Sequence, residues 1–167
     1  SAQAALDEAV RRVTAIALVH ETLSHADADA VEFDGVADRL TAMVADLGEN
    51  TEVVRHGQVG VLPGSIAGSL ALAVAELLQN AFEHGLQGEG AGRITLDANR
   101  RGRRLRVSIT DDGAGLPTGF DPEADARLGL QIVQTLVRDD LRGSLSWEPG
   151  AGGRGTTATI DLVIPPR

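Results

Sequence analysis

The sequence predicts an α/β fold, a two-layer sandwich in which a mixed, mainly antiparallel sheet carries helices on one face. Apolar residues recur at helical spacing between Asp34 and about Leu47. Leu105, Val107 and Ile109 alternate with polar residues, which is typical of a strand with one buried face. Helical and strand patterns follow one another along the chain with turns between them, and this mixture indicates the fold class.

Each expected element has a local signal. Asp34 is expected to cap the second helix, and the Pro63-Gly64 turn precedes a long third helix. The stretch 99–102 is interpreted as the turn of a hairpin, and 113–127 as a lid. The expected helices cover 2–24, 34–47, 65–85 and 128–138, and the expected strands lie near 51–55, 93–98, 104–111, 143–148 and 155–163.

The first helix is expected to be amphipathic, with an apolar stripe at 3-4 spacing that also contains a histidine. The stripe consists of Leu6, Ala9, Val13, Ile16, His20 and Leu23. Between about Ser24 and Asp34 the sequence is dominated by Ala and Asp. We therefore place a boundary there, which divides the chain into residues 1–30 and 31–167.

Composition narrows the classes of function. The net charge of -9 argues against generic nucleic-acid binding. The chain has no cysteine, so it forms neither disulfides nor Cys-based zinc sites. No apolar run is expected to approach the roughly 20 residues that span a bilayer, and no signal peptide is recognisable, so we expect a cytoplasmic module without a membrane segment. The one basic cluster, at 100–106, is interpreted as a solvated turn or as a docking patch for an acidic partner.

The stretch 76–85, with the sequence ELLQNAFEHG, combines polar and apolar positions in a way that suggests chemistry. On a helix, Glu76, Asn80 and His84 are spaced i, i+4 and i+8 and share one face. The amide oxygen of Asn80 suits Mg²⁺, and Glu76 can polarise a nearby water or hydroxyl. The alternative is an ordinary amphipathic helix with a solvated edge.

Three glycine-containing motifs follow in order. The motif DDGAG places Asp111 at the tip of a strand and then a backbone without side chains, which suits a flat ligand that donates a hydrogen bond to a carboxylate. Gly129 opens a helix, where free amides favour phosphate. The motif GRGT, from Gly153 to Thr156, precedes the last strand.

The order of these four motifs, over about residues 60 to 164, resembles the ATP-binding domain of the GHKL superfamily. In that comparison ELLQNAFEH is the N-box, and DDGAG, LGLQIV and GRGT are the glycine boxes. The resemblance implies the Bergerat ATP-binding fold, with ATP and Mg²⁺ as cofactors. The short distance between the first two glycine boxes is similar to histidine kinases rather than to gyrase-type members.

The resemblance also implies a role for each motif residue. Asp111 accepts a hydrogen bond from the exocyclic amine of adenine, Asn80 holds Mg²⁺, and Glu76 is the general base or a water-mediated metal ligand. His84 contacts phosphate or ribose, or has a helix-terminal role. The remaining implied nucleotide contacts are Gly113, Gly115, Leu116, Gly129, Leu130, Gly153, Gly155 and Thr156, with Thr157 as the alternative hydroxyl.

The N-terminal segment 12–23 resembles the second helix of the dimerisation domain in histidine kinases whose phosphoacceptor motif is H-R-x-K-N. That motif does not occur here. The resemblance therefore implies a fragment of a larger sensor kinase that dimerises through its dimerisation helices and passes phosphate to a response regulator. We expect His20 to be structural, and the fragment not to phosphorylate itself.

Three departures from the family pattern affect function. Glu83 stands where many histidine kinases carry Lys or Arg, so it is expected to turn outward or to meet an Arg, and the outward orientation is favoured. Arg127 replaces a common glycine, and the F-box is absent or degenerate. We therefore expect nucleotide binding of modest affinity. The alternatives are an anti-sigma-factor serine kinase and a nucleotide-sensing module without phosphotransfer.

Overall fold

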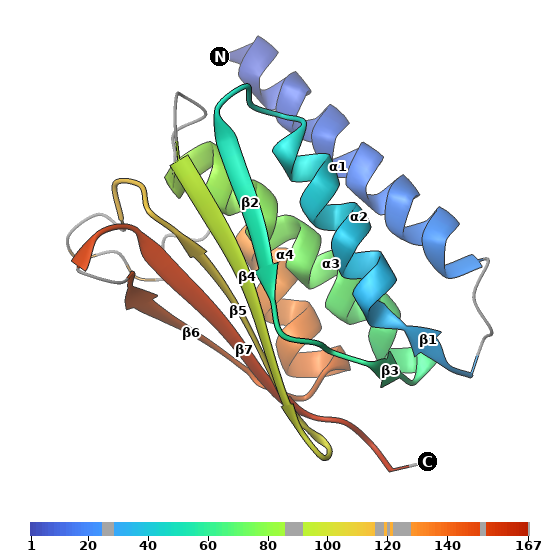
Figure 1. Cartoon of the computed structure of the whole chain (residues 1–167). Helices are drawn as coiled ribbons and strands as arrows, with labels where there is room; N and C mark the ends of the chain where they lie inside the picture. The colour runs from blue at the N-terminus through green and yellow to red at the C-terminus, as the bar shows by residue number, and fades with distance from the viewer. Residues whose placement is uncertain are drawn as a thin grey trace.

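A computed structural model describes residues 1–24, 29–85, 92–115, 119, 121, 128–150 and 153–166. Figure 1 shows a sheet whose one face is covered by helices. The helices are α1 (Ala2–Ser24), α2 (Phe33–Ala45), α3 (Gly64–Asn80) and α4 (Leu128–Thr135). The strands are β1 (Val31–Glu32), β2 (Thr51–His56), β3 (Val61–Leu62), β4 (Gly92–Arg101), β5 (Arg104–Asp111), β6 (Ser144–Pro149) and β7 (Thr156–Val163).

The main sheet has the strand order β2-β4-β5-β7-β6. Strand β2 is parallel to β4, whereas the β4–β5, β5–β7 and β6–β7 pairs are antiparallel. The predicted mixed, mainly antiparallel sheet with helices on one face is thus confirmed. The short antiparallel pair of β1 and β3 was not predicted, because two residues are too few to show a period.

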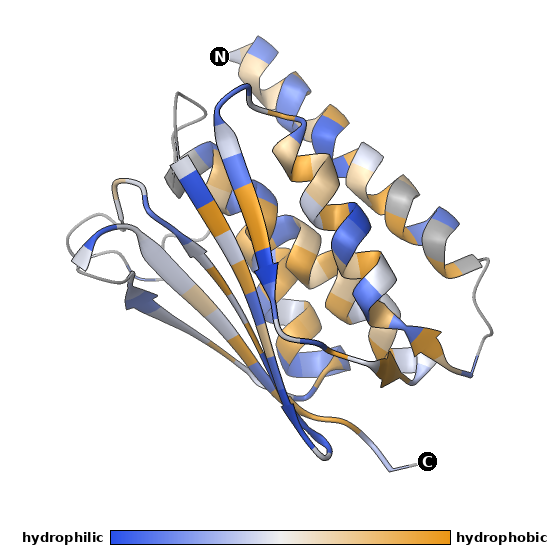
Figure 2. Cartoon of the chain, viewed as in Figure 1, coloured by the Kyte–Doolittle hydropathy of each residue, from blue (hydrophilic) through white to orange (hydrophobic). Residues whose placement is uncertain are grey.

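The core lies between the sheet and the helices. Alternate residues of β5 (Leu105, Val107 and Ile109) are buried on this face, and Ile160 of β7 joins them. The far end of the β4–β5 hairpin is hydrophilic and is coloured blue in Figure 2. This arrangement follows from the period-2 pattern of the strands.

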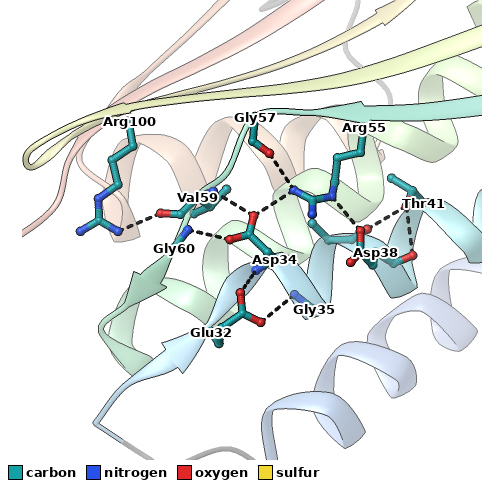
Figure 3. Close-up of polar contacts among 11 residues, drawn as sticks. Glu32, Asp34, Gly35, Asp38, Thr41, Arg55, Gly57, Val59, Gly60 and Arg100 are labelled. Atoms are coloured by element: carbon teal, nitrogen blue, oxygen red, sulfur yellow. Dashed lines mark hydrogen bonds and ion pairs between the residues drawn. The ribbon is translucent and has the colours of Figure 1, made fainter.

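The predicted cap of the second helix was wrong. Helix α2 is capped by Glu32, whose side chain accepts hydrogen bonds from the amides of Asp34 and Gly35. Asp34 instead accepts from the amides of Val59 and Gly60, at 2.9 and 2.8 Å (Figure 3). A tertiary contact therefore overrides the local preference of Asp for the cap position.

The hairpin is longer than predicted. Arg101 pairs with Arg104, so Gly102 and Arg103 form the turn, and Gly102 has a φ of 63°. The guanidinium of Arg100 donates to the carbonyl of Val59 at 2.8 Å (Figure 3). It also donates to the carbonyl of Val61 at 2.7 Å. One member of the basic cluster is thus structural and not simply solvated.

Helices α3 and α4 both end in π-helical turns, at Ala81–Gly85 and Leu136–Asp140. The predicted helix over 65–85 is therefore α-helical only to Asn80. Because a π-turn advances by five residues per hydrogen bond, the i+4 face through Glu76 and Asn80 does not continue regularly to position 84.

Helix α1 buries a different stripe from the predicted one. Ala15 and Val19 pack against the core, and Leu23 is partly buried there. Apart from Leu23, the apolar residues of the predicted stripe face outward: Leu6, Val13 and Ile16 are exposed, and so is the neighbouring Val10. His20 is exposed on α1 as well, and its structural role stays a prediction.

One helical stretch has the length and apolar composition of a membrane span, against the expectation that no run approaches that length. It is Gly64–Glu83, and 67% of its most apolar window is buried inside the fold. Length and composition alone are weak evidence, because the core helix of a globular domain passes the same test. Here the stretch is the central helix of the helical layer (Figure 1).

Candidate functional site

The first half of the candidate site is formed where β5 and β7 end beside each other. Asp111 is 4% exposed and lies in register with Thr156. Its Oδ1 accepts a hydrogen bond from the amide of Gly113 at 3.0 Å. Burial raises the pKa of Asp111 above its ordinary value, although the amides of Gly113 and Thr156 act against this rise. The carboxylate is therefore fixed at the end of the strand and shielded from water.

Glycines of two separate motifs meet around this carboxylate. Gly155 has a φ of 73°, and a Cβ there would lie 1.8 Å from the carbonyl oxygen of Asp111. Gly115 has a φ of 81°, and its Cβ would lie 3.2 Å from the carbonyl oxygen of Gly155. Any side chain at position 155 would collide with backbone, so the first and last glycine motifs are packed against each other.

The register of the sheet separates the two candidate hydroxyls. Thr156 is 7% exposed and shares the helix-facing side of the sheet with Asp111. Thr157 lies on the opposite side, where its hydroxyl is within 2.9 Å of that of Thr110. Gly153 is exposed, and a Cβ there would meet no described atom within 4 Å. The geometry therefore supports Thr156 over Thr157, and leaves Gly153 at the rim.

The second half of the candidate site lies between α3 and α4. Here the N-box and the second glycine box meet at a cavity of about 20 Å³, a space for about one water molecule. Its lining residues include Glu76, Asn80, Glu83, Gly129 and Leu130. The structure thus brings together the predicted metal-binding and phosphate-binding residues.

Helix α1 contributes two arginines to this second half. The Nε of Arg12 donates to Oε1 of Glu76 at 2.8 Å, and its Nη2 lies 3.4 Å from Oε2. This hydrogen bond to Glu76 raises the pKa of Arg12. The neighbouring Arg11 donates through Nε to Glu83 at 2.5 Å. Glu83 therefore does not turn outward, as the sequence favoured: its side chain is 15% exposed and meets an Arg, which was the other expectation.

Arg11 and Arg12 were not predicted as site residues. Their partners lie 72 and 64 residues further along the chain, beyond the reach of any local pattern. The one local signal is the pair of adjacent arginines within a helix that is otherwise rich in Ala and Val.

Some predicted residues lie outside what the structure describes. Leu116 and most of the lid are among them, and so is the side chain of His84. Within the described ranges, His, Asp and Glu side chains form no group of three or more that could hold a metal ion. A metal at Asn80 would therefore need other ligands, such as phosphate oxygens and water.

The chain belongs to the family described as histidine kinase-, DNA gyrase B- and HSP90-like ATPases, whose model matches residues 66–166. A histidine kinase model matches residues 1–47, which favours a histidine kinase over the anti-sigma-factor alternative. The chain is 42% identical to the sensor histidine kinase PdtaS of Mycolicibacterium smegmatis over 98% of its own length. It spans about a third (33%) of that relative.

A second relative leads to the same family. The chain is 30% identical to blue-light-activated histidine kinase 2 of Erythrobacter litoralis, over 95% of this chain and 47% of that protein. Among solved structures, the histidine kinase domain of Erythrobacter litoralis EL346 superposes with a TM-score of 0.80 and 27% identity. That match covers 96% of this chain and 81% of the solved one.

Proposed function

We propose that this chain is the ATP-binding catalytic part of a sensor histidine kinase. It binds ATP between its two half-sites, and the γ-phosphate passes to a histidine on a dimerisation helix outside this chain and then to an aspartate of a response regulator. Membership of the ATPase family and the match of the N-terminal segment to a histidine kinase model support this proposal.

The observation that carries the proposal is the buried carboxylate of Asp111 within a glycine cradle. A carboxylate has about four acceptor sites, so Asp111 can accept from the exocyclic amine of adenine while it keeps its bonds to the backbone. Gly115 and Gly155 let the backbone of the first and last glycine motifs pack closely beside Asp111, where a side chain at position 155 would collide with main chain. Thr156 is placed on the same side of the sheet and supplies a hydroxyl.

The second half-site provides the polar groups that phosphoryl transfer needs. Asn80 would hold Mg²⁺, which neutralises charge on the phosphates when bound. Gly129 and Leu130 lie at the N-terminus of α4, where free amides and the helix dipole favour phosphate. Glu76 would accept the proton of the incoming histidine, because it projects from α3 into the same cavity.

The exposed apolar residues of α1 support a dimeric parent protein. Leu6, Val10, Val13 and Ile16 are 46–65% exposed, and such a stripe is usually covered by another helix. We therefore propose that this stripe faces the other dimerisation helices of the parent kinase, and that the module works in the cytoplasm, where ATP and response regulators are available.

The experiment that tests nucleotide binding is calorimetric titration of the Asp111→Ala variant with ATP. Loss of a hydrogen bond to a charged group costs roughly 1.5–3 kcal/mol, so ATP affinity should fall at least about tenfold. The matched control is Asp112→Ala, because Asp112 is the exposed neighbour and should change affinity by less than about twofold. Unchanged affinity in a folded Asp111→Ala variant would remove Asp111 from the site.

A second titration tests the magnesium assignment. Asn80→Ala removes an oxygen ligand, so it should lower ATP affinity more in Mg²⁺ than in EDTA. Asn99→Ala, in the distant hairpin, serves as the control and should alter neither titration. An equal loss of affinity for Asn80→Ala in both buffers would mean that Asn80 has a structural role.

A further inference from the structure

A groove lined by arginines lies on the face of the sheet that the helices leave uncovered, and we call it the arginine groove. Because Leu105 is buried on the helix side, its neighbours Arg104 and Arg106 on β5 face the other side. The groove has a volume of about 750 Å³, and its charged lining residues are Arg101, Arg104, Arg106, Arg142 and Asp161. In a chain with a net charge of -9, four arginines thus gather around one carboxylate.

The charges of the arginine groove are not balanced within the domain. Arg106 donates to Asp161 at 2.7 Å. Arg101, Arg104 and Arg142 form no ion pair with any residue in the described ranges. Arg101 and Arg104 also lie directly opposite each other in the β4–β5 ladder, where like charges destabilise a strand pair. The groove therefore carries excess positive charge that the fold itself does not use.

Arg142 is held in an unfavourable backbone conformation. Its φ is 50°, the only positive φ of a non-glycine residue in the part of the chain that the structure describes. It lies just beyond the π-helical turn Leu136–Asp140 and its C-cap Leu141, where glycine is usual because it has no Cβ. An arginine kept at such a position, beside a groove with three others, indicates that its side chain has a role.

The spacing of the arginines defines the ligand. Arg104 and Arg106 lie two residues apart on one strand, so their Cα atoms are roughly 7 Å apart. An extended peptide presents alternate side chains on one face with the same period, so carboxylates at every second position match the two guanidinium groups. Val163 is opposite Arg104 and 51% exposed, and it provides apolar surface for the stems of these acidic side chains.

Two other anionic partners fit the groove less well. No aromatic side chain is among its described lining residues, so the bases of a single-stranded nucleic acid would lack a stacking platform. A nucleic-acid backbone also carries a charge at every phosphate, and Asp161 would repel any charge placed directly over it. A lipid surface is flat and would not reach the floor of a groove. A segment with spaced acidic residues can leave Asp161 without an opposing charge.

We propose that the arginine groove docks an extended protein segment that carries acidic residues at alternate positions. This inference goes beyond the proposed function, because the groove is separate from the nucleotide site. Asp111 and Arg104 lie at opposite ends of the eight-residue strand β5, roughly 23 Å apart, and on opposite faces of the sheet. A partner can therefore be held on this domain while the proposed ATP site stays open.

A pair of peptides with the same composition tests the spacing. Both are labelled with fluorescein and contain Glu and Thr in equal number; one has the two residues in alternation, and the other has all its Glu residues in one block. Binding to this chain is followed by fluorescence anisotropy at low salt. The alternating peptide should bind about threefold to fivefold more tightly, because one additional exposed ion pair changes affinity by at most about fivefold.

Two variants and one control locate the binding. Arg104→Gln and Arg142→Gly should each weaken binding of the alternating peptide about threefold to fivefold. Arg142→Gly should not lower the midpoint of urea unfolding, because glycine adopts a positive φ without strain, so its loss of binding reports the side chain. The matched control is Arg93→Gln: Arg93 is an exposed arginine of the same sheet that already meets Glu52 at 3.0 Å, and its loss should change affinity by less than about 1.5-fold.

Equal binding of the alternating and blocked peptides, or unchanged binding in both variants, would overturn the proposal. Tighter binding of an RNA oligonucleotide or of phosphatidylglycerol vesicles that is lost in Arg142→Gly would also overturn it and assign the groove to that partner. ATP affinity, measured by calorimetry, should be the same for Arg104→Gln and wild type. A wild-type chain that docks the alternating peptide but binds no ATP would contradict the proposed function alone.

Discussion

Two clusters of arginine and carboxylate side chains hold helices in place in this protein, and they are built differently. In the α2–β2 corner, Asp34 accepts from two backbone amides as well as from Arg55, at 2.9 Å (Figure 3). Where α1 meets α3, the carboxylates of Glu76 and Glu83 meet arginine side chains of α1. The corner combines main chain and side chain, whereas these α1–α3 ion pairs are formed between side chains.

This difference indicates which cluster can open. The amides of Val59 and Gly60 cannot leave Asp34 without distortion of the chain between β2 and β3. That chain is also confined: Gly57 has a φ of 76°, and a Cβ there would lie 1.9 Å from the carbonyl oxygen of Ala98. The arginines of the α1–α3 ion pairs can leave their partners by a movement of α1 alone. The corner is therefore the more permanent of the two clusters.

The largest expected effect in this comparison follows from Asp34→Ala. The substitution leaves two backbone amides and Arg55 without their shared acceptor, in a place where the Asp34 side chain is 14% exposed. The cost of such buried donors predicts a loss of about 3 kcal/mol in the free energy of unfolding. Urea unfolding followed by circular dichroism measures it.

Two counterparts test whether the corner and the α1–α3 ion pairs really differ. Asp38→Ala removes the other carboxylate that meets Arg55; the Asp38 side chain is 66% exposed, so the loss should be less than about 1 kcal/mol. Arg12→Ala should cost about 1.5 kcal/mol, less than Asp34→Ala, because it leaves no backbone amide without an acceptor, although the Glu76 side chain is only 9% exposed. A loss for Arg12→Ala as large as that for Asp34→Ala would mean that the α1–α3 pairs are as permanent as the corner, and the distinction would be lost.

The same comparison explains what the sequence could predict. The sheet and its helices were predictable because each rests on a local pattern. The set around Asp111 was predictable because each of its two motifs is recognisable locally, although the motifs are far apart in the sequence. The α1–α3 ion pairs and the Asp34 contacts join residues between 21 and 72 positions apart. Their partners are chosen by packing, which a single sequence does not reveal.

Errors in the predicted elements have the same origin. Asp34 has the residue type of a helix cap, yet Val59 and Gly60 compete for its carboxylate, and Glu32 takes the cap. On α1, Ala15 and Val19, which lie outside the predicted apolar stripe, pack against the domain. In both places a tertiary contact decides between two locally acceptable arrangements. The residue roles assigned to the site stay predictions.

The last and smaller expected effect is a pH dependence that separates two buried carboxylates. Burial alone would raise the pKa of Asp34, but the amides of Val59 and Gly60, together with Arg55, hold it below its ordinary value. Its contribution to stability is therefore complete above the unfolded pKa of about 4 and is lost as the pH falls through the folded pKa. At pH 7 the free energy of unfolding of wild type should exceed that of Asp34→Asn by about 1–2 kcal/mol. This difference should disappear as the pH falls.

Asp111 should behave in the opposite way. Because burial raises its pKa in the folded state, its contribution is most favourable below the unfolded pKa and declines as the pH rises through the folded one. The free energy of unfolding of wild type relative to Asp111→Asn should therefore improve as the pH falls, whereas relative to Asp34→Asn it should worsen. Urea unfolding of the three proteins between pH 3 and pH 7 measures both differences in the free energy of unfolding. This pH range includes the ordinary Asp pKa of about 4. If the two differences in free energy of unfolding changed with pH in the same direction, the backbone amides around Asp34 would not distinguish it from Asp111.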